Sequence, residues 1–299
     1  MPSWGNVEDP DDAMVAMNRL AVGRALAWQA SAEAGNKGLD LDLAAASRAV
    51  LRDLRSTVYV SRHRWFVYTM AAAAASAVLA GWAGLMPGIG RDMSPAAALT
   101  TVLAMYLALD AYTGILHTVL DCPGHIDTPL IGRACAEFMW HHVFPHDIAT
   151  KPLVEACGDT NTIIATIVAS AVALVHVWGY RSPAAWGWSA YTAGLAVLFG
   201  YLGQWAHRRA HSGATTASCS WLLLSPRTHA RHHRHPENGT SYAILSGATE
   251  PLLALLRLCV PPRAFPFTWV ALWAAATVGL VAVPTWCFVS LFGNFSISL

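Results

Sequence analysis

Residues 95–121 read PAAALTTVLAMYLALDAYTGILHTVLD. At about 1.5 Å per residue, a helix over Pro95–Val119 is long enough to cross the hydrocarbon core of a bilayer. Only Asp110 and His117 interrupt its apolar character before Asp121. An ionisable side chain inside such a segment is a functional candidate by default. The stretch therefore predicts a membrane-spanning helix that carries part of a polar site.

The composition of the whole chain supports this interpretation. It has 299 residues, of which 55% are hydrophobic and 12% are charged, whereas soluble domains carry about 25% charged residues. Net charge is +1, so no general attraction to nucleic acid is expected. We predict an all-α integral membrane helical bundle with about five transmembrane spans. Besides Pro95–Val119, the expected spans are Trp65–Met86, Thr162–Tyr180, Ala184–Trp205 and Phe267–Phe292, the last bent at Pro284.

The apolar segments divide the chain into three predicted parts. Residues 1–62 form a soluble or amphipathic N-terminal region, 63–260 the central domain, and 261–299 a C-terminal span. Early acidic residues make the start unlike a signal or transit peptide. Apolar positions recur at helical spacing from Asp42. That helix either lies on an anionic membrane surface or packs as a soluble helix, and both interpretations stay open.

Basic residues are distributed unequally between the two predicted sides of the membrane. Of the 19 Lys and Arg residues, only Arg91 and Arg181 fall on the side opposite the N-terminus. The positive-inside tendency places the N-terminal side, and the histidine-rich loops with it, in the cytoplasm or its equivalent. We expect a multi-pass protein of the plastid or endoplasmic reticulum membrane in a eukaryote, or of the inner membrane in a bacterium.

Histidines recur at helical offsets on that side. Residues four apart, or at i, i+3 and i+4, share one face of a helix, and neutral imidazole is a common metal ligand. The six cysteines form no CxxC pair, which argues against a thiolate site. Any one of these histidines is explained as well by a hydrogen-bonded loop position, but eight in register favour a metal centre. The predicted metal ligands are His117, His141, His142, His207, His211, His229, His232 and His233.

Eight imidazoles are too many for one ion. A single zinc or iron takes about four to six ligands, so the set suits a pair of ions, and a histidine-rich di-iron site is the best match. Asp110 and Asp121 are predicted as catalytic candidates. Asp110 lies two turns before His117, where it could hold a ligand in place or bind a second ion, and Asp121 could bind metal or orient an imidazole. Whether Asp110, Asp121, His125, His146 or His235 touches metal stays open.

Several motifs in order carry a family resemblance between Asp110 and Gly247. They are D-x3-G-x2-H-x3-D at 110–121, T-P-x2-G at 128–132, the His141-His142 pair with Pro145, H-x3-H at 207–211 after Gln204, and H-x2-H-H at 229–233, followed by Arg234, Pro236, Asn238, Tyr242, Ile244, Ser246 and Gly247. In these motifs the chain resembles the lipid desaturases that include the animal plasmanylethanolamine desaturase (Kua), bacterial CarF, and the plant plastid enzyme that makes trans-3-hexadecenoate in phosphatidylglycerol.

The resemblance implies an O2-dependent desaturase with two non-haem iron ions that puts a double bond into a membrane phospholipid chain. No flavin, haem or dinucleotide motif is visible, so electrons should come from an external donor such as cytochrome b5 or ferredoxin. In the families that the chain resembles, the animal enzymes carry another histidine shortly after the His141-His142 pair, and the plant branch lacks it. No further histidine follows His146 before Asn161 here, so the resemblance favours the plant-like phosphatidylglycerol branch over vinyl-ether formation by a plasmanylethanolamine desaturase. A di-iron lipid hydroxylase is another alternative. A membrane metal transporter or sensor is disfavoured, because transporters place their ligands near the bilayer midplane.

Overall fold

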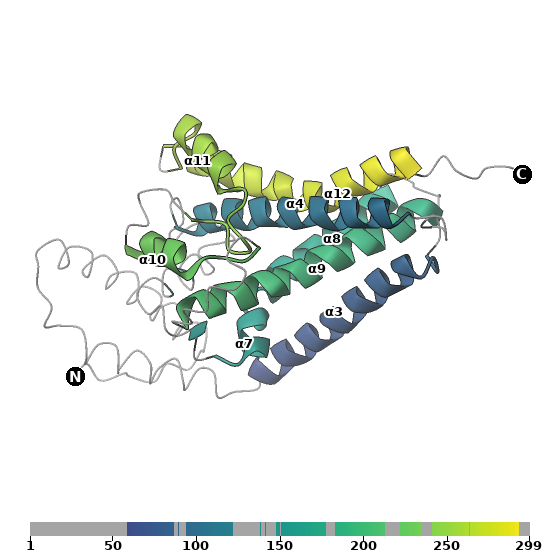
Figure 1. Ribbon diagram of the computed structural model, residues 1–299, viewed down its shortest axis with the longest axis horizontal. Helices are drawn as coiled ribbons and strands as arrows, with labels where there is room; N and C mark the ends of the chain where they lie inside the picture. Colours follow the sequence, from purple (N-terminus) through teal and green to yellow (C-terminus); the bar gives the residue numbers. More distant parts are fainter. Residues whose placement is uncertain are drawn as a thin grey trace, which may run out of the picture.

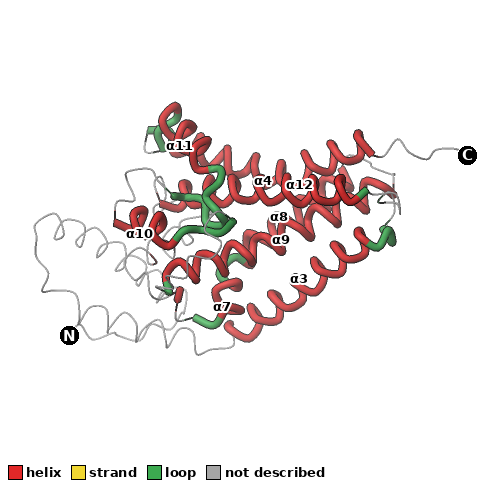
Figure 2. Tube along the Cα trace, viewed as in Figure 1, coloured by secondary structure: helices red, strands yellow, loops and turns green. Residues whose placement is uncertain are grey.

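The computed structural model describes residues 59–86, 89, 94–121, 138, 141, 148–149, 151–177, 183–212, 222–234, 241–262 and 264–292. Helices dominate these residues (Figure 2), and the only strand-like feature among them is an isolated bridge between Met86 and Ile89. The predicted all-α class is therefore confirmed. Residues 1–58 and the predicted helix from Asp42 lie outside the described residues.

The long helices of the described residues pack into one bundle (Figure 1). They are α3 (Tyr59–Trp82), α4 (Pro95–Asp121), α8 (Asn161–Val177), α9 (Pro183–His211) and α12 (Pro266–Phe292). Helix α9 contacts each of the other four. Buried Ser189, Thr192 and Gln204 lie along it. A central position explains this composition, since helix-facing polar groups can find partners that lipid cannot provide.

Small residues bring α3 and α9 close together. A Cβ added at Gly194 would lie 3.0 Å from the carbonyl oxygen of Ala74, and one at Gly81 would lie 2.6 Å from the ring of Tyr191. At the end of α3, the indole N–H of Trp82 donates to the Tyr191 hydroxyl at 2.8 Å. Small side chains at helix crossings are the usual means of tight packing in membranes.

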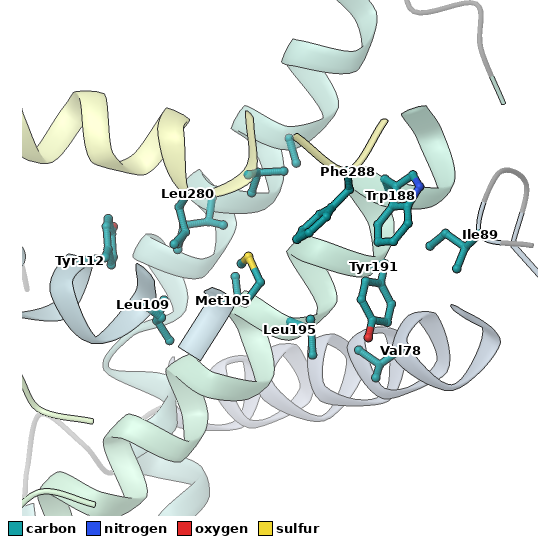
Figure 3. Close-up of a cluster of buried hydrophobic side chains, with 14 of the residues drawn as sticks. Val78, Ile89, Met105, Leu109, Tyr112, Trp188, Tyr191, Leu195, Leu280 and Phe288 are labelled. Carbon is teal, nitrogen blue, oxygen red and sulfur yellow. The ribbon is translucent and has the colours of Figure 1, made fainter. Parts of the chain in front are cut away.

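Buried side chains from α3, α4, α9 and α12 form one core (Figure 3). Trp188 stacks on Phe288 with ring centroids 4.9 Å apart. Polar links reinforce the apolar contacts, because the Trp273 indole and the Thr277 hydroxyl both donate to the Tyr112 hydroxyl, at 3.1 and 3.3 Å. This core fixes α4 and α9 relative to each other, and both helices carry site residues at one end.

The outer faces of the bundle are apolar, as a lipid-facing surface would be. Exposed side chains include Trp65, Leu79, Leu99, Val283 and Trp286. Among the described residues, three helices are long and apolar enough to cross a membrane, over Arg64–Trp82, Pro95–Asp121 and Pro266–Phe288, and Asn161–Ala173 is a shorter apolar helix. The helices α3, α4, α8, α9 and α12 match the positions of the five predicted spans, but the span count stays a prediction.

Three short helices flank the end of the bundle at which α4 and α9 finish and α12 begins (Figure 1). They are α7 (Leu153–Gly158), α10 (Pro226–Arg234) and α11 (Glu250–Cys259). Helix α7 packs on α3 and α9, α10 on α9, and α11 on α4. The candidate site lies at this end.

Candidate metal centre

Each helix that reaches the site presents its polar side chains one turn apart. His117 and Asp121 lie in the last turns of α4, and His207 and His211 in the last turns of α9. Helix α10 begins at Pro226, a residue well suited to the first helical position. Its buried face carries His229 and His232, while Arg227, Thr228 and Arg231 are exposed. The offsets read from the sequence thus place imidazoles on shared helix faces.

Five imidazoles form the first group, which we call the five-histidine group. Its members are His141, His207, His211, His229 and His233, and one ring nitrogen from each lies within 4.8 Å of the others. The Nε2 atoms of His211 and His229 are 2.8 Å apart, those of His229 and His233 3.1 Å, and those of His207 and His211 3.3 Å. The rings come from α9, α10 and His141, so the five imidazoles come together only in the folded chain.

A carboxylate lies at the centre of the second group, which we call the Asp121 group. Asp121 Oδ2 is 3.2 Å from His117 Nε2 and 3.2 Å from His232 Nε2. The three side chains are almost completely buried, with exposed fractions of 1% for His117, 3% for Asp121 and 0% for His232. Two imidazoles and a carboxylate oxygen form a set of nitrogen and oxygen donors suited to a divalent transition metal.

The two groups are adjacent. His232 and His229 stack with ring centroids 5.7 Å apart, and the ring of His117 lies 6.4 Å from those of His207 and His229. Helix α10 contributes to both groups, so its orientation sets the two donor sets relative to each other. Together they hold seven imidazoles and one carboxylate.

The chemistry of the donors fits a metal pair. Ring nitrogens that face one another at about 3 Å either share a proton in an N–H···N hydrogen bond or repel as two lone pairs. His229 Nε2 faces the Nε2 atoms of both His211 and His233 and carries one proton at most, so a shared cation suits this set of nitrogens better than protons do. Burial lowers the pKa of His229 well below the ordinary value of 6.5, and the neighbouring imidazoles of His207, His233, His211 and His232 lower it further. His229 is therefore neutral at pH 7 and has a lone pair to donate.

One backbone carbonyl fixes the ring of His117. His117 Nδ1 lies 2.7 Å from the carbonyl oxygen of Tyr242, and a carbonyl can only accept. The proton therefore resides on Nδ1, which leaves the Nε2 lone pair directed at Asp121. The Tyr242 ring also packs against the rings of His117 and His232, with centroids 5.3 and 4.8 Å away.

The structure brings together eight of the ten side chains predicted for the site. His142 lies outside the described residues, as do His125, His146 and His235. Asp110 belongs to neither group, because its carboxylate accepts hydrogen bonds from Ser246, Gly247 and Thr249.

Sequence reasoning missed the residues that support His117. Tyr242 acts through its backbone carbonyl. Glu250 accepts from the backbone N–H groups of Tyr242 and Ala243, and the Arg257 guanidinium lies 4.3 Å above the Tyr242 ring. The one sequence feature that pointed to this segment was the motif of Tyr242, Ile244, Ser246 and Gly247 that follows the histidines. Residues 242–245 are buried.

Comparison with known proteins identifies the family. The lipid desaturase domain family matches residues 106–260, a range that contains both groups. Over 154 residues the chain is 27% identical to fatty acid desaturase 4, chloroplastic, of Arabidopsis thaliana, covering 50% of this chain and 46% of the relative. It is 25% identical over 156 residues to plasmanylethanolamine desaturase 1 of Mus musculus, covering 49% and 56% of the two chains.

A bacterial relative is equally similar. Over 146 residues the chain is 27% identical to plasmanylethanolamine desaturase of Myxococcus xanthus, covering 47% of this chain and 50% of the relative. The chain thus spans about half the length of the curated relatives that it matches. No solved structure matches it. Because the family match covers more than half of the residues and all of the clustered donors, the chain belongs to the lipid desaturase domain family.

Proposed function

We propose that the chain is a membrane-bound, non-haem di-iron, O2-dependent desaturase that introduces a double bond into the acyl chain of a phospholipid. The observation that carries the proposal is the pair of adjacent donor groups, one of five imidazoles and one built on Asp121, that share helix α10. Iron bound by these groups would supply O2 activation, which imidazole and carboxylate donors suit.

The overall reaction sets what the protein has to provide. Removing a hydrogen atom from each of two adjacent carbons yields two electrons, whereas reducing O2 to two waters takes four. The remaining two electrons and two protons come from an external donor and the solvent. The chain's own part is to hold the metals, align the lipid and exclude water, and the burial of His117, His207 and His232 supports water exclusion.

The outer face of α10 supports an approach route for the electron donor. Arg227 and Arg231 are exposed on that face, and each lies within two residues of a clustered histidine. An acidic carrier such as cytochrome b5 or ferredoxin would meet a basic surface there, close to the metals.

For the substrate, the favoured candidate is a plant-like phosphatidylglycerol chain. The absence of a further histidine between His146 and Asn161 supports this choice. Vinyl-ether formation on a plasmanyl lipid is the second candidate, because two of the relatives carry that activity in their names at 25% and 27% identity. A transporter is not favoured, since the donors gather at one end of the helices rather than midway along them.

Lipid mass spectrometry with double-bond localisation tests the proposal. The chain is expressed in a host together with an electron carrier, and its membrane lipids are compared with those of the His232→Ala variant. We expect a new double bond that the variant does not form, because His232 belongs to the Asp121 group. His176→Ala, which alters an exposed histidine at the end of α8, is the matched control and should keep the product.

The position of the new bond separates the candidates. A trans-3 acyl chain in phosphatidylglycerol supports the favoured substrate, and a vinyl ether supports the second candidate. A hydroxylated lipid would show that the metal centre inserts oxygen instead. Product formation by His232→Ala would show that this histidine of α10 is not needed in the metal centre.

A further inference from the structure

Asp110 is a completely buried carboxylate in the middle of an apolar helix, with an exposed fraction of 0%. A charge in such surroundings is costly unless strong hydrogen bonds compensate it. Its Oδ1 accepts from the backbone N–H groups of Ser246 at 2.7 Å and Gly247 at 3.1 Å. Its Oδ2 accepts from the backbone N–H of Thr249 at 3.0 Å and the Thr249 hydroxyl at 2.8 Å. Both oxygens are therefore engaged by one loop.

That loop, residues 241–249, is the segment that also reaches the metal centre. We call it the strap. The Tyr242 carbonyl accepts from His117 Nδ1 at 2.7 Å, near the start of the strap, while Asp110 binds near its end. Asp110 and His117 are seven residues apart on α4, which is about two turns on one helix face. Helix α4 thus holds the strap at two points, one of them a predicted metal ligand.

The middle of the strap lies directly on the α4 backbone. A Cβ at Gly114 would lie 3.3 Å from the Ala243 nitrogen and 2.2 Å from Leu253 Cδ1, so a larger residue would displace Leu253 and press on the strap. The backbone N–H of Ile244 donates to the Thr113 hydroxyl at 3.3 Å. Glu250 Oε2 accepts from the N–H groups of Tyr242 and Ala243 at 3.0 and 3.2 Å. With so many contacts, a shift at one end of the strap is transmitted to the carbonyl at the other.

We propose that Asp110 is a positioning residue that holds the strap so that the Tyr242 carbonyl orients His117 toward the ion of the Asp121 group. This inference rests on the proposed function only in requiring that the Asp121 group binds a metal ion. Asp110 itself binds none, because both of its oxygens already accept hydrogen bonds from the strap. Support of this kind typically changes metal affinity about 10- to 100-fold.

Titration with Co²⁺ of the full chain in detergent micelles tests this role. Asp110→Asn keeps the shape of the side chain but turns an NH2 donor toward backbone N–H donors. We expect the Co²⁺ affinity of the Asp121 group to fall about 10- to 100-fold while the five-histidine group keeps its affinity. The absorption bands that disappear in Asp121→Asn identify the Co²⁺ bound to the Asp121 group.

Two further variants separate positioning from general destabilisation. Thr249→Val removes the hydroxyl donor at nearly constant shape, and it should shift the same Co²⁺ site by a smaller factor even if Asp110→Asn does not fold. Phe288→Ala, which removes the ring stacked on Trp188 in the core, is a control that should lower the melting temperature without touching the strap or a hydrogen bond to Asp110. It should leave the ratio of the two affinities unchanged.

Three results would overturn the inference. The first is wild-type Co²⁺ affinities and spectrum in both Asp110→Asn and Thr249→Val. The second is an equal loss of affinity from both groups, and the third is the same change in affinity ratio in Phe288→Ala. The proposed function fails separately, if wild-type protein with both groups loaded with iron forms no desaturated lipid.

Discussion

At the residue scale, the carboxylate of Asp121 serves two imidazoles in a pocket that water barely reaches. Its Oδ2 lies 3.2 Å from Nε2 of both His117 and His232. Asp121→Asn keeps the volume but removes the negative charge, so the Asp121 group should lose its ion while the five-histidine group keeps its own. Elemental analysis of purified protein should show iron falling from about two ions to about one per chain.

A control of matched chemistry accompanies that change. Asp159→Asn removes an exposed carboxylate paired with Lys151, away from the clustered donors, and should keep both ions. Unchanged iron content in Asp121→Asn would place the second ion elsewhere. Loss of both ions would show that the two groups bind metal as one unit.

The depressed pKa of His229 gives the metal-free protein a pH dependence with a defined sign. Between the folded pKa and about 6.5 the unfolded chain binds a proton that the folded chain refuses, so stability falls as pH drops below about 6.5. Thermal unfolding of metal-free protein from pH 7.5 to 5.5 should show the loss, and His229→Gln should reduce the slope. Equal slopes in the two proteins would contradict the burial of a neutral imidazole at this position.

At the element scale, helical offsets in the sequence predicted much of the site. The spacing of His207 and His211, and of the histidines in α10, places donors on shared faces, and the structure brings those faces together. The strap could not be predicted in the same way. It acts through the Tyr242 carbonyl and through backbone N–H groups, which every residue except proline possesses, so no side-chain pattern marks it.

Asp110 illustrates the same limit. Its depth in an apolar helix predicted a functional group, but its partners lie 136 to 139 residues later in the chain. Only the packing of α11 and the strap on α4 distinguishes a carboxylate that binds metal from one that holds a loop.

Helix α10 has a buried face that carries clustered histidines and an exposed face that carries Arg227 and Arg231. Neutralising both exposed arginines, in Arg227→Gln/Arg231→Gln, should slow lipid desaturation by about 10-fold at low salt, because it weakens attraction for an acidic carrier. Rates measured against carrier concentration should show a higher apparent KM for the carrier in the double variant. Added salt should reduce the difference in rate between the variant and wild type. Metal content should not change.

A variant at a distant arginine makes that result specific. Arg181→Gln also removes one basic residue, from the side predicted to lie opposite the site, and should keep the wild-type rate. A double arginine variant that reacts with the carrier as fast as wild type would exclude this face of α10 as the docking surface.

At the scale of the whole molecule, the site lies at one end of a helical bundle (Figure 1), and three of the described helices are long and apolar enough to cross a bilayer. Helix α9 has 29 residues, which is about 43 Å at 1.5 Å per residue, and its last two turns carry His207 and His211. If α9 crosses the membrane, its two ends must lie on opposite sides. Its first residues then share the side predicted for Arg181, and its last residues share the side of the histidines.

Single cysteines at the two ends of α9, in a background without the six native cysteines, test this arrangement. A membrane-impermeant maleimide added to intact cells should label Pro183→Cys, at the start of the helix, and leave Ser212→Cys, at an exposed position just past its end, unlabelled until the membrane is opened. The reverse pattern would place the metal centre on the outer side. Protection of both positions in intact cells would mean that α8 and α9 enter and leave on one side, which leaves three crossings rather than five and still brings the histidines of α9 and α10 together.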